Sequence, residues 1–254
     1  NLSNWDISSV TKLNQVFLGC YNLQTIDDID TWDTSNVDDF RDVFQACRSL
    51  TADVSSWNTS NGIYFSGVFY GLSTIGSQRI SGYDNWDLSS ASSTNNLSGR
   101  GMFAYASNGQ SLFTDGFPSN WNFGNGRCLD IAFRRTNFNE TNITCNITTS
   151  PSLVTCDQTF MEIGRYGADS ITFTSNFDVS GVTIARYMFA SNSQPISAEF
   201  GISFPSGTDW GSVTNFQNFL TNTTLSSADY NALLIDIEAS NQNSNVIFDA
   251  PLCT

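Results

Sequence analysis

The sequence predicts an α/β solenoid, a stack of about eight coils in which each coil supplies one short parallel strand and one short helix. Three observations predict it. Similar segments recur at a near-regular spacing, the apolar positions of each segment recur while the polar ones change, and one amphipathic helix follows the last segment. We therefore assign residues 1–224 to the stack and residues 225–254 to a C-terminal capping helix and tail.

One large apolar residue anchors each repeated segment. Residues 5–17 read WDISSVTKLNQVF and residues 32–44 read WDTSNVDDFRDVF, so the apolar pattern is kept while the polar residues vary. A single coil cannot bury its own apolar edge, but stacked coils can, which is why the apolar positions must recur. The anchors are Phe17, Phe44, Phe69, Phe103, Phe133, Phe160 and Phe189, with Leu220 as a weaker eighth.

The residues before each anchor predict a helix. In the first segment Val10, Leu13 and Val16 lie seven, four and one residues before Phe17. These offsets place the side chains on one face of a two-turn helix. Ser9, and Ser35 in the second segment, stand where an N-cap is expected.

The residues after each anchor predict a coil that turns a corner every few residues. From Phe17 the apolar residues come at every third position, beginning with Cys20 and Leu23. A period of three fits neither a long helix nor a long strand. We expect a short strand near residues 26–29.

Five tryptophans hold a fixed place in the pattern. Each lies at the same distance before its anchor, except Trp86, where an insertion lengthens the distance to Phe103. An aromatic ladder that binds sugars is one interpretation and a buried core stack is the other. The fixed register favours the core stack. The tryptophans are Trp5, Trp32, Trp57, Trp86 and Trp121.

The motif W-D-x-S-x-V, followed by V-F-x-x-C-x-x-L, resembles the BspA-like leucine-rich repeat of bacterial surface proteins and lipoproteins and of some protist surface proteins. Residues 1–73 match well and residues 86–220 loosely. The family's usual Met before the final Phe is Val in the first three repeats and appears at Met102 and Met188. The resemblance implies a leucine-rich-repeat-like stack on an exterior surface, often adhesive, with no catalytic motif to carry over.

Charge and composition exclude several classes of function. The net charge is −14, Lys12 is the one lysine, and there is no histidine. So acidic a chain is repelled by nucleic acids and anionic membranes. Hydrolases with a catalytic His and His-bearing zinc sites are excluded. We predict no nucleic-acid partner, no membrane span and no cofactor, with oxygen-ligated calcium left open.

Six cysteines, an even number, suit an oxidising compartment. Cys20 and Cys47 hold the same place in consecutive coils, which brings them within disulfide reach if their side chains converge. Cys128 and Cys156 are also one coil apart, at almost matching places, and form the second candidate pair. Cys145 and Cys253 then remain and would pin the tail to a coil. The resemblance implies instead that Cys20 and Cys47 are core thiols, and both possibilities stay open.

N-glycosylation sequons occur at seven sites, including Asn58, Asn139, Asn142 and Asn146. The number is what chance gives in a chain so rich in Asn, Ser and Thr, so the count itself is no sign of glycosylation. The cluster in residues 139–149 is the candidate segment if the source is a secreting eukaryote; otherwise it is a polar loop.

Outward positions before successive tryptophans form an acidic and hydroxyl strip. One interpretation is a surface that contacts calcium or carbohydrate. The other, which we favour, is a solvated face that keeps sheet edges from pairing. The strip consists of Asp28, Asp30, Asp53, Ser55 and Asp84.

Taken together, these features favour a non-enzymatic extracellular binding or adhesion module of a cell-surface protein that contacts a protein or glycan. A structural component of an exterior assembly, such as a viral fibre, a decoration protein or a cell-surface filament, is the alternative, and a virion surface is then the location. A glycan-active enzyme is the function that the sequence supports least. Because residue 1 lies inside a repeat, we expect further repeats of a longer chain, or a partner subunit, at that end.

Overall fold

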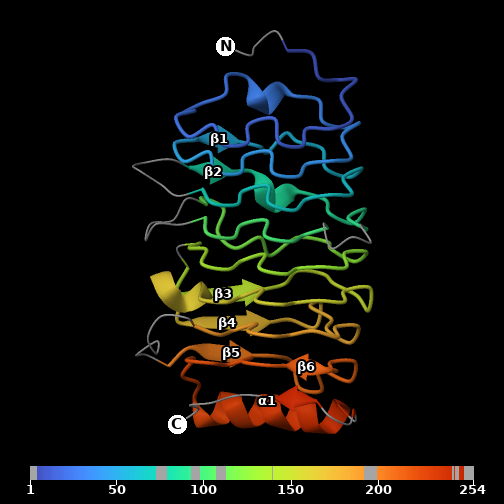
Figure 1. The fold of residues 1–254 in the computed structure, drawn as a ribbon, viewed down its shortest axis with the longest axis vertical. Coiled ribbons are helices and arrows are strands. Elements are labelled where there is room, and N and C mark those ends of the chain that lie inside the picture. Colours follow the sequence, from blue (N-terminus) through green and yellow to red (C-terminus); the bar gives the residue numbers. More distant parts are fainter. Residues whose placement is uncertain are drawn as a thin grey trace.

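The structure of the protein is a computed structural model that describes residues 5–72, 79–92, 98–106, 113–138, 140–191, 199–241, 243 and 246–248. The chain winds back and forth in layers along the long axis of the molecule, with the N-terminal residues at one end and the C-terminal residues at the other (Figure 1). Each layer lies against the layer that follows it in sequence. We number these coils one to eight by their anchors, from Phe17 to Leu220.

Regular elements are short, and α1 is the one α-helix in the described residues. The parallel sheets have the orders β1–β2, β3–β4–β5 and β6–β7, so each strand pairs with a strand of a neighbouring coil. In chain order the elements are η1 (Ile29–Thr31), β1 (Ala52–Asp53), β2 (Ile80–Ser81), η2 (Tyr83–Asn85), β3 (Asn142–Cys145), η3 (Ile163–Tyr166), β4 (Ser170–Phe173), β5 (Gly201–Ser203), β6 (Asn215–Phe216), α1 (Ser227–Ser240) and β7 (Ile247–Phe248), where η marks a 3-10 helix.

The predicted helices before the anchors are wrong, because Lys12 and Asp39 form a parallel bridge and residues 14–19 and 41–46 form turns. The residues two before and two after the anchor Phe17 are left-handed, with φ of +61° at Gln15 and +71° at Gly19. Left-handed residues at this spacing break an α-helix. Ser35 is likewise not an N-cap, since its N–H donates to Asp33 Oδ1 at 3.0 Å and closes a turn.

This backbone conformation builds a hydrogen-bond ladder between coils. The N–H groups of Leu13, Gln15, Phe17 and Gly19 donate to carbonyls of coil two at 2.8–3.1 Å. Four such bonds recur at each of the seven junctions between coils, and in all of them the N–H belongs to the earlier coil. The ladder therefore has a direction, with donors facing the C-terminal end of the stack.

The predicted corners after the anchor are confirmed, and they account for the period of three. Cys20 N–H donates to the carbonyl of Phe17, and Leu23 N–H to that of Cys20, so each turn closes on the residue three back. The strand expected near residues 26–29 is wrong, because η1 begins there and the first strand is β1. The period of three in the sequence therefore indicated turns of the backbone.

The anchors form a continuous aromatic column. Phe17 stacks on Phe44 with ring centroids 5.9 Å apart, and the stacking continues through Phe69, Phe103, Phe133, Phe160 and Phe189. The eighth anchor is confirmed at Leu220, which is buried, and the residue before it, Phe219, meets Phe189 edge-on.

The tryptophans form a second column, and the predicted core stack is confirmed by their burial. Trp32, Trp57 and Trp86 stack at 6.0–6.3 Å and all are buried, as is Trp121. The indole N–H groups of Trp57, Trp86 and Trp121 donate to carbonyls inside the stack, that of Trp57 to the Ile29 carbonyl at 3.1 Å. Trp5, in the first coil, stacks on Trp32 but remains 51% exposed.

The predicted C-terminal helix is present as α1, which lies across the end of the stack (Figure 1). Ser226 caps it by accepting the N–H of Asp229 at 3.1 Å. Leu233 is buried against the core, and Ser240 Oγ accepts the N–H of Trp210 at 2.9 Å. In the described part of the chain, no helix has the length and hydropathy that a membrane span requires.

Candidate binding surfaces

The predicted acidic strip lies on neighbouring coils. Asp30 is in η1, Asp53 ends β1, and Asp84 is the equivalent of Asp30 in η2. Asp28 directly precedes η1, and Ser55 lies against Gly82 of the next coil. The positions therefore follow one side of coils one to three.

The carboxylates of the strip are partly engaged within the protein. Asp53 Oδ1 accepts the Ser55 N–H at 3.0 Å, and this bond holds the pKa of Asp53 below its usual value. Asp84 accepts the side-chain amide of Asn120 at 2.7 Å. Among the described residues no group of three or more acidic or thiol side chains converges as metal ligands would. Binding of calcium or carbohydrate by the strip stays a prediction.

The cysteines of the described residues are free thiols, so the two predicted pairs, Cys20 with Cys47 and Cys128 with Cys156, are not bridged in this structure. Cys145 is also free, and its proposed partner Cys253 lies outside the described residues. Cys47 Sγ instead donates to the Phe17 carbonyl at 3.0 Å. Equivalent places in adjacent coils bring side chains near one another without directing them at each other.

Burial makes most of these thiols chemically inert. It raises the pKa of Cys47 and of Cys128 to about 12, and it raises those of Cys145 and Cys156 as well. The nucleophilic form is the thiolate, which these groups do not reach at neutral pH. Cys20, in the first coil, is exposed.

Two of the predicted glycosylation sites are exposed in the structure, Asn58 and Asn142, and Asn146 is half-buried. The side-chain oxygen of Asn142 accepts the Ser170 hydroxyl, and that of Asn146 accepts the Thr174 hydroxyl. Asn139 lies outside the described residues. Glycosylation of these sites stays a prediction.

Coils three to five bring tyrosines and arginines together, which sequence reasoning missed. The rings of Tyr70 and Tyr105 meet edge-on with centroids 5.5 Å apart. The guanidinium carbons of Arg134 and Arg135 lie 5.1 and 5.7 Å from the centre of the Tyr105 ring. We call Tyr70, Tyr105, Arg100, Arg134 and Arg135 the tyrosine–arginine cluster.

The ladder register positions this cluster. Tyr70 follows its anchor by one residue and Tyr105 by two, as Arg134 and Arg135 follow Phe133. Tyr105 N–H donates to the Arg134 carbonyl at 2.8 Å, which sets coil four on coil five. In the sequence, the adjacent pair Arg134 and Arg135 and the repeated offset from the anchors indicated this cluster.

Positive charge exceeds negative charge around the cluster. Buried Glu162 accepts from Arg135 and from Arg165, so one carboxylate serves two guanidinium groups. Arg134 Nη1 donates to the neutral Gln158 side chain at 2.6 Å, and its buried Nε has no hydrogen-bond partner in the described part of the chain. Burial raises the pKa of Tyr70, and the nearby Tyr105 hydroxyl adds to this increase. The positive charges of Arg134 and Arg100 act in the opposite direction.

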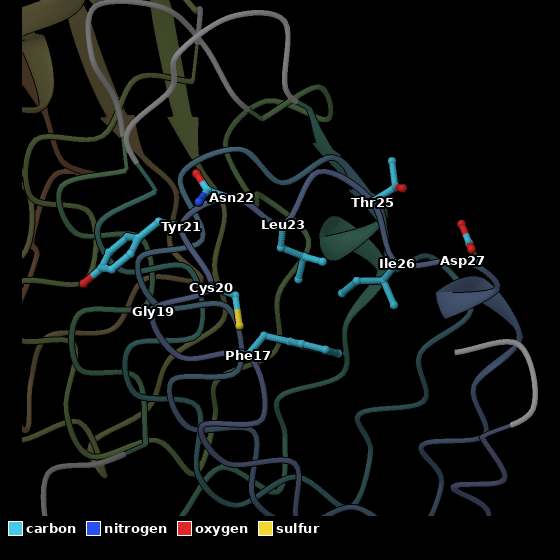
Figure 2. A pocket seen from close by; sticks show the side chains of 9 residues that line it. All are labelled: Phe17, Gly19, Cys20, Tyr21, Asn22, Leu23, Thr25, Ile26 and Asp27. Atoms are coloured by element: carbon cyan, nitrogen blue, oxygen red, sulfur yellow. The ribbon is translucent and has the colours of Figure 1, made fainter. Parts of the chain in front are cut away.

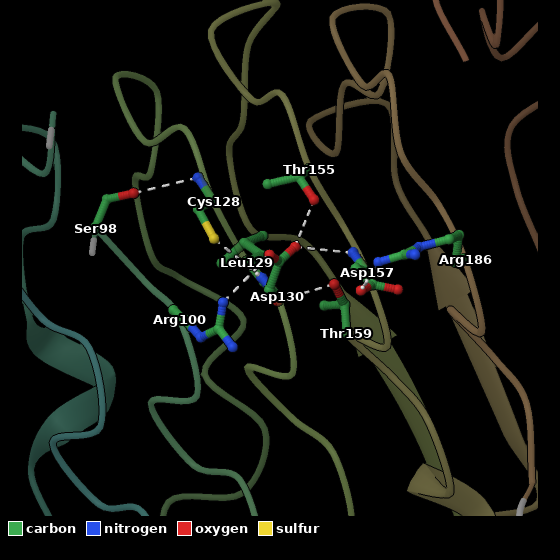
Figure 3. Close-up of polar contacts among 9 residues, drawn as sticks. All are labelled: Ser98, Arg100, Cys128, Leu129, Asp130, Thr155, Asp157, Thr159 and Arg186. Carbon is green, nitrogen blue, oxygen red and sulfur yellow. Dashed lines mark hydrogen bonds and ion pairs between the residues drawn. The ribbon is translucent and has the colours of Figure 1, made fainter. Parts of the chain in front are cut away.

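A row of charged residues beside the cluster ties coils four to seven together (Figure 3). Buried Asp130 accepts the Thr155 hydroxyl at 2.5 Å and the Asp157 N–H at 2.9 Å, and Arg100 lies 3.9 Å away. Asp157 in turn pairs with Arg186 at 2.8 Å. The acids of this row make contacts between neighbouring coils, so the row supports the stack.

The first coil carries two hollows at the N-terminal end of the stack. One, of about 590 Å³, is lined by residues 17–27, and Figure 2 shows the side chains of Phe17, Leu23 and Ile26 pointing into it. The other, of about 440 Å³, is lined by residues between Trp5 and Val16. Every lining residue belongs to coil one, so both hollows open where no described coil covers the stack.

Residues 1–116 match one protein-family model. Its description is "Mycoplasma protein of unknown function, DUF285". The match runs from the first coil into the fourth, and therefore covers the region where the repeat is most regular. No curated protein and no solved structure matches the chain.

Proposed function

We propose that the chain is a leucine-rich-repeat-like solenoid that acts as a non-enzymatic binding or adhesion module on the outside of a cell. The observation that carries this proposal is the tyrosine–arginine cluster, a positively charged and aromatic surface on a chain whose net charge is −14. Such a local reversal of charge is typical of a surface that recognises an anionic partner. The resemblance of the repeat to BspA-like surface proteins supports the location.

The ligand class we propose is a carboxylated or sulfated glycan. Guanidinium groups bind carboxylate and sulfate oxygens with paired, charge-assisted hydrogen bonds. The part-buried rings of Tyr70 and Tyr105 provide rigid faces against which sugar rings pack. An acidic protein surface is the competing partner.

The state of the buried ionisable groups supports a non-enzymatic role. Two nitrogens of the Arg41 guanidinium donate to the Asp39 carboxylate. The Glu162 carboxylate pairs with Arg135 and Arg165. Burial keeps the pKa of the Cys47 thiol high. Groups committed in this way are poorly placed to transfer protons or attack a substrate.

The test is binding of the purified chain to a glycan array, followed by titration of the best sulfated or uronic-acid glycan. We expect Arg134→Ala to weaken binding about tenfold and added salt to weaken it further. Arg48→Ala is the matched control, because Arg48 makes the same contact with Tyr21 at 5.0 Å, far along the stack in coils one and two. Equal losses in both variants, or binding only to acidic proteins, contradict the glycan proposal.

A second function, a structural component of an exterior assembly, is favoured by the first coil. Trp5, Leu18 and Tyr21 are exposed there, although the large hydrophobic side chains in the described part of the other coils are buried or half-buried. Analytical ultracentrifugation of the chain and of Leu18→Asp distinguishes the two functions, because self-assembly through that end is lost in the variant.

A further inference from the structure

The three arginines of the tyrosine–arginine cluster differ in how their charges are balanced. Arg135 donates to the buried carboxylate of Glu162, and Arg100 lies 3.9 Å from a carboxylate oxygen of coil five. Arg134 forms no ion pair with any described residue. Its Nη1 instead donates to the side-chain oxygen of Gln158 at 2.6 Å. Because an amide carries no net charge, Gln158 holds Arg134 in place and leaves its charge unbalanced.

The guanidinium group of Arg134 is fixed on two sides and open on a third. Its carbon lies 5.1 Å from the centre of the Tyr105 ring, and Gln158 holds its Nη1. Its Nε is buried. Its Nη2 has no hydrogen-bond partner in the described part of the chain and is not enclosed as Nε is. An anionic group that binds Arg134 therefore approaches Nη2, beside the ring of Tyr105.

We propose that Gln158 determines the specificity of this site for anions, and that the site takes one anionic group, a single sulfate or carboxylate on a sugar, at Arg134. The ligand class in this inference rests on the proposed function. Gln158 acts through Arg134 and is therefore a positioning residue. A carboxylate in place of its amide would pair with Arg134 and cancel the charge that the ligand needs. Since Glu162 already balances Arg135, a densely sulfated glycan gains little over one that carries a single sulfate.

The repeat supplies a matched pair of variants, because an acid is tolerated at the place that Gln158 occupies. Gln158 lies two residues before its anchor with φ of +58°, and Asp42 has the same place in coil two with φ of +54°. Gln158→Glu should therefore fold. Asn218 has this place in coil eight, with φ of +55°. Asn218→Asp adds the same charge three coils away from Arg134, beyond the distance at which salt screens exposed charges.

The probe is methyl sulfate, titrated into the full chain labelled with nitrogen-15 at arginine and followed by NMR. The Nε–H signal of Arg134 is assigned by its loss in Arg134→Lys, and its proton exchanges slowly with water because it is buried. In the wild-type chain we expect a saturable shift of this signal and a much smaller shift for Arg135. Gln158→Glu should weaken binding at least tenfold, and Asn218→Asp should leave it unchanged.

The dependence on salt separates the charge of Arg134 from the packing around it. Added sodium chloride should weaken binding to the wild-type chain and have little further effect on Gln158→Glu. Gln158→Met removes the acceptor without adding charge, so binding should fall about threefold and stay sensitive to salt. The proposal is overturned by unchanged affinity in Gln158→Glu, by equal shifts at Arg134 and Arg135, or by no shift at Arg134 in the wild-type chain.

Titration with one glycan in singly and multiply sulfated forms distinguishes this inference from the proposed function. We expect the two forms to bind with affinities within about threefold of each other, because one unbalanced charge is available. If the multiply sulfated form binds more than about tenfold tighter, the limit to one anionic group is wrong. If methyl sulfate shifts the Arg134 signal but neither glycan binds, the proposed function is wrong and the role of Gln158 in anion binding stands.

Discussion

The two ends of the stack differ although their residues follow the same repeat. At the C-terminal end Trp210 is fully buried, because α1 and the residues around Asn241 cover the eighth coil. In the first described coil Trp5 occupies the tryptophan column but is 51% exposed, and Trp32 stacks on one face of its ring. A residue's place in the repeat therefore specifies its contacts, and the presence of a neighbouring coil decides whether they are made.

The largest expected effect comes from removing one tryptophan from inside the column and one from its end. Trp57→Ala should lower the free energy of unfolding by about 3–5 kcal/mol, because Trp57 packs between Trp32 and Trp86. Trp5→Ala should lower it by about 1 kcal/mol, since half of that side chain is already in water. Urea denaturation of both variants measures the difference, and similar losses contradict the comparison.

A smaller effect is expected at the covered end. Leu233→Ala should lower the free energy of unfolding by about 2–3 kcal/mol, because Leu233 is the side chain of α1 that is buried in the core. Ile235→Ala is the matched control on the same helix, where the side chain is 64% exposed and little should change. Thermal unfolding followed by circular dichroism checks both. If Ile235→Ala is the more damaging, α1 does not cover the stack through Leu233.

The smallest effect concerns the turn that begins each coil. Asp33 accepts hydrogen bonds from Ser35, which hold the pKa of Asp33 below its usual value. A carboxylate whose folded pKa is lowered stabilises the fold above the unfolded pKa of about 3.9 and loses this contribution as pH falls through the folded value. Asp33→Ala should therefore lower the melting temperature at pH 7 slightly.

Asp33→Asn is the control for that turn. Asn58 occupies the same place in coil three and accepts the Ser60 N–H in the same way, so Asn should keep the turn. The wild-type chain should lose more on acidification to pH 3 than Asp33→Asn does. Identical acid sensitivity would show that the Asp33 carboxylate does not contribute to the folded state.

Periodicity predicted which residues meet and failed to predict how the backbone brings them together. The offsets of Leu13 and Val16 from Phe17 fit a helix, yet this segment turns at left-handed Gln15 and Gly19. Both conformations place the same side chains on one face, so the apolar pattern alone does not distinguish them. The glycines at the left-handed positions of other coils, Gly67 and Gly101, were the signal against a helix.

The candidate surfaces also divide into those that the sequence pattern predicts and those that only the folded backbone brings together. The acidic strip was found because its residues precede tryptophans in sequence, and it lies along coils one to three. The tyrosine–arginine cluster was missed because its members come from three coils, so that Tyr70 and Arg135 lie far apart in the sequence. The thiols of Cys20 and Cys47 hold equivalent places, but the side-chain directions that a disulfide needs are set by the folded backbone.

The sequence alone determined the number and spacing of the coils, the two aromatic columns and the helix at the C-terminal end, because burial of apolar side chains imposes a pattern that can be read along the chain. The tertiary structure alone decided the direction of the hydrogen-bond ladder and, with it, which face of each coil presents its donors and which its acceptors. Backbone N–H and C=O groups are the same in every residue, so their direction becomes defined only when one coil lies on the next.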